Sequence, residues 1–265
     1  MKESTKLGCN KLHGEQIQMT VIQIDNYGPW TDTLGNDREH RLQVLQAELY
    51  SSFQEKFAKR EGLVFFNRFD EMLAVTNGIT KEQHREIQIE INKQFPFTVS
   101  MGVGVGRTPF DAQVNASKLL QKTGSAQSEI RKAELACGRT LDEQESHVQI
   151  IHIDIDRITE TSTDRASAFE TSMKVMTVYA NLMRSLMNHH ALLFYIGGDN
   201  FMGVANGVSV DEITSLLKDC HDSNVELKCG IGIAKTGRKA AELATMNLHK
   251  IRQDRNNFIL ATTHM

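Results

Sequence analysis

The stretch Gln149-Ile-Ile-His-Ile-Asp154 is mainly apolar, carries polar side chains at alternate positions near its end, and closes on a carboxylate. The stretch Thr20-Val-Ile-Gln-Ile-Asp25 has the same form. Alternation of this kind predicts a half-buried β-strand. The two aspartates are 129 residues apart, because 154 − 25 = 129. A strand that recurs together with its terminal carboxylate indicates a fold that is built twice.

Three further blocks recur at nearly the same spacing. They are Leu63-Val-Phe-Phe-Asn-Arg-Phe-Asp70 with Leu192-Leu-Phe-Tyr-Ile-Gly-Gly-Asp199 (199 − 70 = 129), Asn77-Gly78 with Asn206-Gly207 (206 − 77 = 129), and Met101-Gly-Val-Gly-Val105 with Cys229-Gly-Ile-Gly-Ile233 (230 − 102 = 128). Spacing that holds within one residue over four blocks predicts an internal duplication. This alignment makes Asp25 and Asp70 the first-half equivalents of Asp154 and Asp199.

Both halves show the same predicted order of elements. The first strand is followed by an amphipathic helix, a hairpin, a second helix, a glycine-alternating strand and a final helix. The second helix is expected at about 81–93, and again at about 210–220 after the N-cap Ser209. The final helix is expected after Thr108-Pro109, and from Thr236 to about residue 253. This order is βαββαβ with an added helix.

The fold class is therefore α+β, with two ferredoxin-like domains in tandem, each an antiparallel sheet with helices on one face. The expected boundaries are a flexible leader at 1–17, an N-terminal domain at 18–123, a linker segment at 124–146 and a C-terminal domain at 147–265.

The composition is that of an ordinary globular chain, with 265 residues of which 40% are hydrophobic and 24% charged. A formal charge of −3 gives no general basis for binding a long nucleic acid. The longest apolar stretch is far too short to cross a bilayer, and the first residues lack an apolar signal core, so we expect a cytoplasmic chain with no membrane contact. The four scattered cysteines form no Cys-x-x-Cys pair, which argues against zinc.

Two carboxylates of the second half are predicted to approach each other. In a βαββαβ sheet the first strand lies beside the hairpin, which brings Asp154 close to Asp199. Adjacent carboxylates repel and need a cation, and Mg²⁺ takes carboxylate and phosphate oxygens. Gly197 and Gly198 leave room for a phosphate chain beside the turn, although the pair is also a common hairpin turn signal.

Other polar and aromatic residues have two interpretations each. Asp156 is either a third metal ligand or a turn former. His152 is either a general base or a strand residue packed in the cleft wall. Tyr27 and Trp30 form either an aromatic wall for a purine or a rigid loop at a core edge, and Gly124-Ser-Ala-Gln127 offers amide donors or is a linker turn.

The strings His152-Ile-Asp-Ile-Asp156 and Phe194-Tyr-Ile-Gly-Gly-Asp-Asn200 resemble the metal site of diguanylate cyclases and class III nucleotidyl cyclases, which share the polymerase palm fold. A closer resemblance covers about residues 18–255. It is to the archaeal GTP cyclohydrolase III family, also called GTP cyclohydrolase IIa, and it rests on four strings in chain order: Gln23-Ile-Asp-Asn-Tyr-Gly-Pro-Trp30, Arg68-Phe-Asp70, Gly124-Ser-Ala-Gln127 and Ile196-Gly-Gly-Asp-Asn200.

The resemblance implies a palm-like fold and a specific reaction. Members of that family open the imidazole ring of GTP without expelling formate, and release a formylamino-pyrimidine nucleoside monophosphate and pyrophosphate. They use two Mg²⁺ ions rather than zinc, a monovalent cation such as K⁺ activates them, and they assemble as homotetramers. Supply of riboflavin or deazaflavin precursors is implied in the same way.

Carried onto this sequence, the resemblance assigns Mg²⁺ and catalysis to Asp154 and Asp199, with His152 as the candidate base. The other metal candidates are the backbone of Ile155 and the side chains of Asp156, Asp25 and Asp70. The candidates for substrate binding are Gly197, Gly198, Asn200, Gln23, Asn26, Tyr27, Arg68, Ser125 and Gln127. The first-half carboxylates either bind metal, complete a cleft shared with the second half, or are vestigial.

Two other functions are compatible with the same carboxylates. A nucleotidyl cyclase would use a ribose hydroxyl as the nucleophile and leave the purine ring intact. A silent nucleotide sensor would bind GTP without turnover, since a fold does not guarantee activity.

Overall fold

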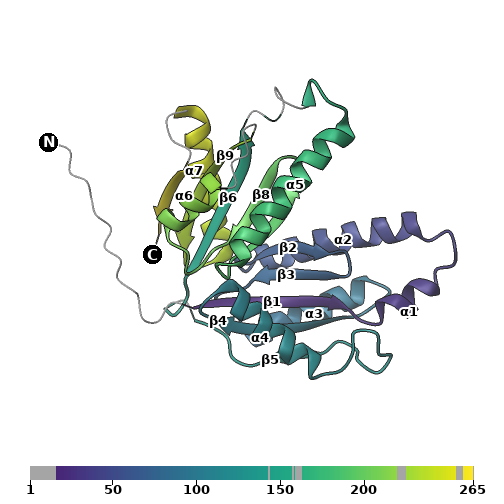
Figure 1. Cartoon of the computed structure of the whole chain (residues 1–265). Helices are drawn as coiled ribbons and strands as arrows, with labels where there is room; N and C mark the ends of the chain where they lie inside the picture. Colours follow the sequence, from purple (N-terminus) through teal and green to yellow (C-terminus); the bar gives the residue numbers. More distant parts are fainter. Residues whose placement is uncertain are drawn as a thin grey trace.

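The computed structural model describes residues 16–142, 144–156, 158, 163–219, 225–254 and 259–264. Two halves are each built on a five-stranded sheet (Figure 1). The first half contains β1 (Ile17–Ile24), α1 (Tyr27–Asp32), α2 (Glu39–Ala58), β2 (Leu63–Arg68), β3 (Glu71–Val75), α3 (Lys81–Gln94), β4 (Val99–Gly106), α4 (Pro109–Gln121) and β5 (Leu135–Cys137). The second contains β6 (Val148–Asp156), α5 (Ala168–Met187), β7 (Leu192–Gly197), β8 (Asn200–Val204), α6 (Val210–Asp219), β9 (Glu226–Ala234), α7 (Gly237–Asp254) and β10 (Ile259–Thr263).

The predicted duplication and the α+β class are confirmed, but the sheets are mixed rather than antiparallel. Their strand orders are β2-β3-β1-β4-β5 and β10-β9-β6-β8-β7. Four strands of each sheet are antiparallel to their neighbours, while β5 and β10 add parallel edges on β4 and β9. The segment 124–146, expected to be a linker, thus supplies a strand to the first sheet. Of the predicted leader, Gln16 and Ile17 already pair with Ser146 and β4, and the rest lies outside the described residues.

Hydrogen bonds correct the sequence alignment of the two halves. In the first hairpin Leu63 pairs with Val75, and in the second Leu192 pairs with Val204. The two hairpins therefore align at an offset of 129 residues, as the sequence predicts. The first strands are shifted by two more residues. Gln23 pairs with Glu71, whereas Asp154 pairs with Asn200, so the structural offset is 154 − 23 = 131.

The consequence for the carboxylates is direct. Asp25 is the structural equivalent of Asp156, and the residue at the position of Asp154 in the first half is Gln23. The expectation that Asp25 and Asp70 reproduce the pair Asp154 and Asp199 is therefore wrong.

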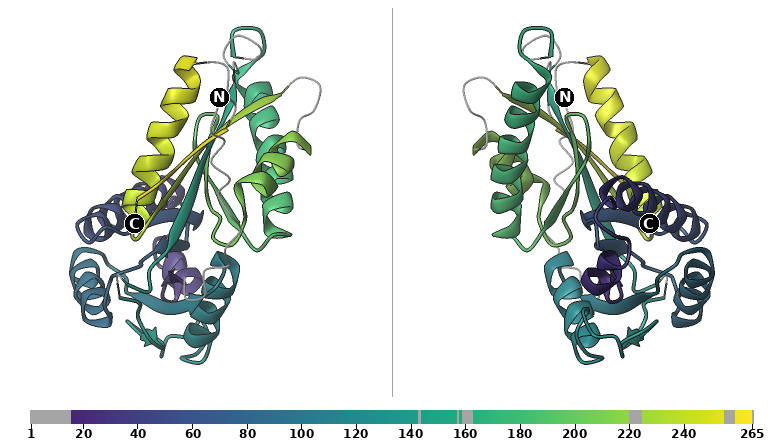
Figure 2. Two further views of the ribbon diagram at one scale, coloured as in Figure 1. Left: turned by 90° about the vertical axis from the view of Figure 1, so that its left-hand side faces the viewer. Right: turned by 90° about the vertical axis from the view of Figure 1, so that its right-hand side faces the viewer.

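The glycine-alternating strands allow a helix to lie directly on the sheet. A Cβ at Gly232 would come within 2.1 Å of the Ala240 carbonyl oxygen, and one at Gly104 within 2.3 Å of the Ala116 nitrogen. Glycine on the strand and alanine on the helix are what this separation requires. As a result α4 and α7 cover one face of each sheet, and α2, α3, α5 and α6 cover the opposite face, as Figure 2 shows for α7 and α5. The expectation of helices on one face only is wrong.

The two halves share a hydrophobic core. Side chains of β2 and β3 on the α4 side of the first sheet pack against side chains of β7 and β8 on the α7 side of the second. The rings of Phe65 and Phe194 stack at its centre, with centroids 4.3 Å apart and planes inclined by 5°. Each half has a further core of its own, under α2 and α3 or under α5 and α6. The halves are therefore one packed unit.

The central strands β1 and β6 start side by side, where Gln16 pairs with Ser146, and diverge from that point (Figure 1). Their carboxylate ends consequently lie in different parts of the molecule.

Candidate functional site

The second half brings its two predicted carboxylates together. Asp154, near the end of β6, lies opposite Asn200, the first residue of β8. Asp199 occupies the turn just before it, and its carbonyl accepts a hydrogen bond from the amide of Ile155 at 3.2 Å. The Asn200 amide donates to the Asp199 carboxylate at 2.7 Å. Neighbouring strands thus position all four residues through the backbone ladder.

The glycines before Asp199 adopt backbone conformations that other residues rarely reach. Gly197 has φ 115° and Gly198 has φ 62°. A Cβ at Gly197 would meet no atom within 4 Å, so the turn is open above it. The positive φ angles are what a tight hairpin turn needs, so they agree with the interpretation of Gly-Gly as a turn signal. The open space above Gly197 is what a phosphate chain would need to approach the backbone.

Arg252, on the last turn of α7, is a functional candidate that sequence reasoning missed. Its guanidinium donates to both carboxylate oxygens of Asp154, at 2.5 and 3.1 Å, and to Asn200 Oδ1 at 3.3 Å. Burial raises the pKa of the Asp154 carboxyl, and the Asp199 and Asp156 carboxylates raise it further, while Arg252 opposes the shift. A basic residue in the last turn of the final helix was the available signal, but nothing in the sequence indicated its partner.

His152 is held at both ring nitrogens. Nδ1 lies 3.0 Å from the Thr245 hydroxyl and Nε2 lies 3.2 Å from Asn200 Oδ1. An amide oxygen only accepts, so these partners assign the proton to Nε2 and leave Nδ1 to accept from Thr245. Burial lowers the pKa of His152 to about 4. A neutral ring with its accepting nitrogen already occupied matches a residue of the cleft wall better than a general base.

Asp156 lies beyond Asp154 on the same strand and forms an ion pair with Lys228 at 2.8 Å. Its first-half equivalent, Asp25, is more completely enclosed.

The Asp25 side chain is 1% exposed and accepts four interactions. The hydroxyls of Ser100 and Thr98 donate to it at 2.6 and 2.7 Å, and the amide of Ala133 at 2.8 Å. The guanidinium of Arg131 lies 3.2 Å away. These bonds fasten the 131–133 segment to the sheet, which is a structural role for a residue predicted as a metal ligand.

The first-half hairpin carries a different set of charges. Gln23, at the position of Asp154, donates to Glu71 at 2.6 Å and accepts from Arg131 at 3.1 Å. Asp70, at the position of Asp199, lies 3.4 Å from Arg68. In the first half both carboxylates, Asp70 and Glu71, belong to the hairpin and the neighbouring strand contributes the Gln23 amide, whereas in the second half the neighbouring strand contributes a carboxylate, Asp154.

The Gly124-to-Gln127 segment packs against the start of α1. The Asn26 amide donates to the Ala126 carbonyl at 2.7 Å, and the Gly28 amide donates to Gln127 Oε1 at 3.1 Å. Ser125 accepts from the Gln127 amide at 3.2 Å. Tyr27 lies beside them.

The Tyr27 hydroxyl accepts from Gln46 at 2.6 Å, and burial raises the pKa of the phenol.

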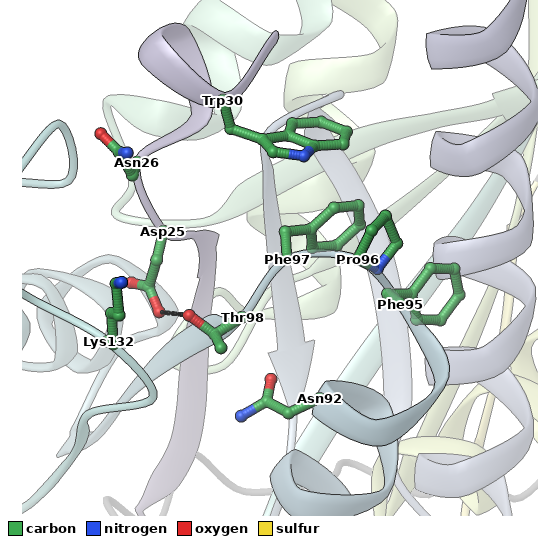
Figure 3. Close-up of a pocket in the computed structure, with 9 residues that line it drawn as sticks. All are labelled: Asp25, Asn26, Trp30, Asn92, Phe95, Pro96, Phe97, Thr98 and Lys132. Atoms are coloured by element: carbon green, nitrogen blue, oxygen red, sulfur yellow. Dashed lines mark hydrogen bonds between the residues drawn. The ribbon is translucent and has the colours of Figure 1, made fainter. Parts of the chain in front are cut away.

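A cavity of about 320 Å³ opens beside these residues (Figure 3). Its lining consists of Asp25, Asn26, Trp30, Asn92, Phe95, Pro96, Phe97, Thr98 and Lys132. The Trp30 and Phe97 rings meet edge to face with centroids 4.8 Å apart. Asn26 Oδ1 is buried without a hydrogen-bond partner in the described part of the chain. Sequence reasoning found Trp30 and Asn26 but not the α3 end or the 95–98 turn, which are distant in the sequence.

Among the residues that the structure describes, no helix is long and apolar enough to span a membrane. In the same residues, no three His, Cys, Asp or Glu side chains are grouped to hold a metal ion.

The fold is of the α+β class, with two mixed five-stranded sheets, and the second sheet carries the Gly-Gly-Asp turn between β7 and β8. The GGDEF domain of DgcB from Caulobacter crescentus in complex with c-di-GMP is similar, with TM-score 0.38 and 14% identity over 45% of this chain and 80% of that one. A bacterial light-regulated adenylyl cyclase has TM-score 0.37 and 13% identity over 44% and 76%.

The family itself is shown by sequence. A family model described as GTP cyclohydrolase III matches residues 19–264. GTP cyclohydrolase III of Methanothermobacter thermautotrophicus is 54% identical over 89% of this chain and 94% of its own length. That of Methanocaldococcus jannaschii is 47% identical over 89% and 88%. The chain belongs to the GTP cyclohydrolase III family, which confirms the prediction from four short strings.

Proposed function

We propose that this enzyme converts GTP into 2-amino-5-formylamino-6-(5-phosphoribosylamino)pyrimidin-4(3H)-one and pyrophosphate, and that its second half carries the chemistry. The family match supports the reaction. One observation favours the second half. There Asp154 lies next to Asp199, whereas the first half has Gln23 at the position of Asp154.

The residues of this site fit a divalent cation. Mg²⁺ prefers carboxylate and carbonyl oxygens. Asp154 is buried near two other carboxylates that raise its pKa, and Arg252 supplies one positive charge against them. Asp154, Asp199 and the backbone of Ile155 would hold Mg²⁺, with Asp156 as a further candidate. Bound Mg²⁺ would stabilise the charge that develops on phosphate oxygens. K⁺ as a monovalent activator is proposed from the family resemblance.

The protein's own side chains have separate tasks in this proposal. Gly197 and Gly198 admit the triphosphate to the backbone of the turn. Arg252 neutralises Asp154 in the free protein, and its guanidinium would be available to phosphate oxygens if Asp154 held Mg²⁺. His152 orients Asn200 through its Nε2 proton.

The first-half residues form a separate nucleotide-contacting surface in this proposal. Asn26 and the Trp30 ring line the cavity there, and the flat aromatic ring suits stacking on a planar base. Gln23, Arg68 and Gln127 lie at the same end of the first sheet. We also propose that the chain works as a homo-oligomer, a tetramer by resemblance to the family.

The first experiment incubates the purified protein with GTP, Mg²⁺ and K⁺, follows the ultraviolet spectrum and identifies products by mass spectrometry. We expect loss of the purine absorbance, release of pyrophosphate and a monophosphate product that retains the formyl group. A cyclic guanine nucleotide with unchanged absorbance would mean a cyclase, and intact GTP under all metal conditions would mean a sensor.

Variants locate the chemistry in one half. Asp154→Asn and Asp199→Asn should each lower the rate by about 100-fold or more, because each removes a metal-holding charge. Asp70→Asn, at the equivalent turn of the first half, is the matched comparison and should keep the order of magnitude of the wild-type rate. Equal losses at Asp70 and Asp199 would contradict the assignment to the second half.

Arg252→Gln distinguishes the two tasks given to that residue. We expect a higher KM for GTP together with a lower Mg²⁺ concentration at half-maximal rate, because the variant loses a phosphate partner and also the cation that competes with Mg²⁺ for Asp154. An unchanged Mg²⁺ dependence would contradict that competition.

A further inference from the structure

Helix α5 is apolar on two faces. Its inner face contributes Val175, Val178, Leu182 and Leu186 to the core of the second half. Its outer face leaves five large apolar side chains exposed, with exposed fractions of 76% for Phe169, 58% for Met173, 37% for Met176, 42% for Met183 and 53% for Met187. Large apolar side chains gathered on one exposed face mark a contact surface more often than a solvated one.

The spacing of the exposed residues is that of a coiled-coil seam. With the exposed Ala180 included, the positions are 169, 173, 176, 180, 183 and 187, so the steps are 4, 3, 4, 3 and 4. Alternating steps of three and four are the a and d positions of a heptad repeat, which pack against a second helix with the same pattern. We call these six residues the α5 stripe.

The duplication provides an internal comparison. Tyr50 of α2 donates to the Val64 carbonyl as Tyr179 of α5 donates to the Leu193 carbonyl, so the two helices align at the offset 179 − 50 = 129. The α2 positions that match the α5 stripe are His40, Val44, Ala47, Ser51, Gln54 and Ala58. The fold is thus compatible with a mainly small or polar outer face on this helix. Of these two equivalent helices, only α5 carries the apolar stripe in the described part of the chain.

We propose that the α5 stripe is a two-fold interface with α5 of a second copy of this chain, the two helices running antiparallel. A symmetric antiparallel seam places Phe169 against the partner's Met187, and Met173 against the partner's Met183, because both sums equal 356. In the same register the flanking residue Glu170 lies beside the partner's Arg184, and Thr177 lies beside the partner's Thr177. In both pairs the two residue numbers add up to 354.

This charge pattern favours a second copy over an unrelated partner. The register that places the apolar side chains of one helix against those of the other also places the exposed Glu170 beside the exposed Arg184. The two-fold symmetry produces this pair twice. In the described part of the chain the Arg184 side chain has no ion-pair partner. Flanking pairs of this kind set the register and direction of helix pairs more than they add affinity. The interface rests on this pattern and not on the proposed reaction.

Sedimentation equilibrium of the full chain tests the interface. Met173→Glu with Met183→Glu places four carboxylates in the seam, and we expect the particle mass to fall to half that of the wild type. Val44→Glu on α2, at the position equivalent to Met173, is the matched control and should leave the mass unchanged. A wild-type monomer, or an unchanged mass in the double variant when its circular dichroism is native, would overturn the proposal.

A charge exchange tests the register. Arg184→Glu should raise the dissociation constant of the dimer step by about tenfold, because each of two symmetric pairs becomes repulsive. Adding Glu170→Arg should restore association, even though Glu170 also caps its own helix through Ser167. Failure of the second change to rescue the first would contradict the antiparallel register. Turnover of GTP is measured separately, so loss of assembly and loss of the reaction are distinguished.

Discussion

At the scale of single residues, the carboxylates at the ends of β1 and β6, namely Asp25, Asp154 and Asp156, pair with cations that come from far along the chain. Arg252 reaches Asp154 across 98 residues, and Lys228 reaches Asp156 across 72. The carboxylates could be predicted because they end recognisable strands. The cations could not, since a basic residue near a helix end is ordinarily solvated.

His84 shows that the first half buries a titratable group far from either candidate site. It is fully buried, with Nδ1 2.7 Å from the Thr80 carbonyl and Nε2 2.8 Å from the Thr20 hydroxyl. Burial lowers its pKa to about 4, against an ordinary value of 6.5. The folded state therefore favours the neutral ring.

This depressed pKa predicts a pH dependence of stability. The contribution is intact above pH 6.5 and is lost as the pH falls towards 4, because the unfolded chain then binds a proton that the folded chain excludes. At about pH 4.5 the loss is between about 2 and 3 kcal/mol. Urea unfolding at pH 7 and pH 4.5 measures it. His84→Gln should lose less stability between the two pH values than the wild type, and an equal loss would contradict the prediction.

At the scale of elements, the helices followed from their periodicity and caps. Residues 81–93 were predicted and Lys81–Gln94 is observed. Ser209 caps α6 as expected, accepting from the Glu212 amide at 3.2 Å. The short strands β5 and β10 were not predicted, because an edge strand of three to five residues depends on the neighbour that pairs with it more than on its own pattern.

The contact between β9 and α7 yields the prediction for this scale. Gly232→Ala should lower the free energy of unfolding by about 1–3 kcal/mol, because its Cβ would lie 2.1 Å from a helix carbonyl and force α7 outward. Gly138→Ala is the control, since its Cβ would make an ordinary contact of 3.6 Å with Leu119. Thermal or urea unfolding of both variants measures the difference. Equal stability would mean that α7 is not held against the strand.

At the scale of the whole molecule, the shared core makes the two halves one folding unit. Phe65→Ala and Phe194→Ala should each cost about 3–5 kcal/mol, and the double variant should cost less than their sum by about 1 kcal/mol, because the stacked pair is lost only once. Urea unfolding of the four proteins closes the cycle. Strict additivity, or two separate transitions in the wild type, would show that the halves unfold independently.

The sequence by itself determined the duplication, the hairpins, the main helices, the Gly-Gly-Asp turn and the family, because each of these is written in local spacing or in a specific string. Only the tertiary structure decided which first-strand residue stands at the position of Asp154. A shift of two residues keeps every side chain on its own face of the sheet, so the alternation of polar and apolar residues is the same in both registers. The hydrogen bonds to β3 and β8 are what distinguish Gln23 from Asp25. The divergence of β1 and β6 likewise arises from packing between the two halves. The sequence of one half does not indicate it, because it depends on the core that both halves share.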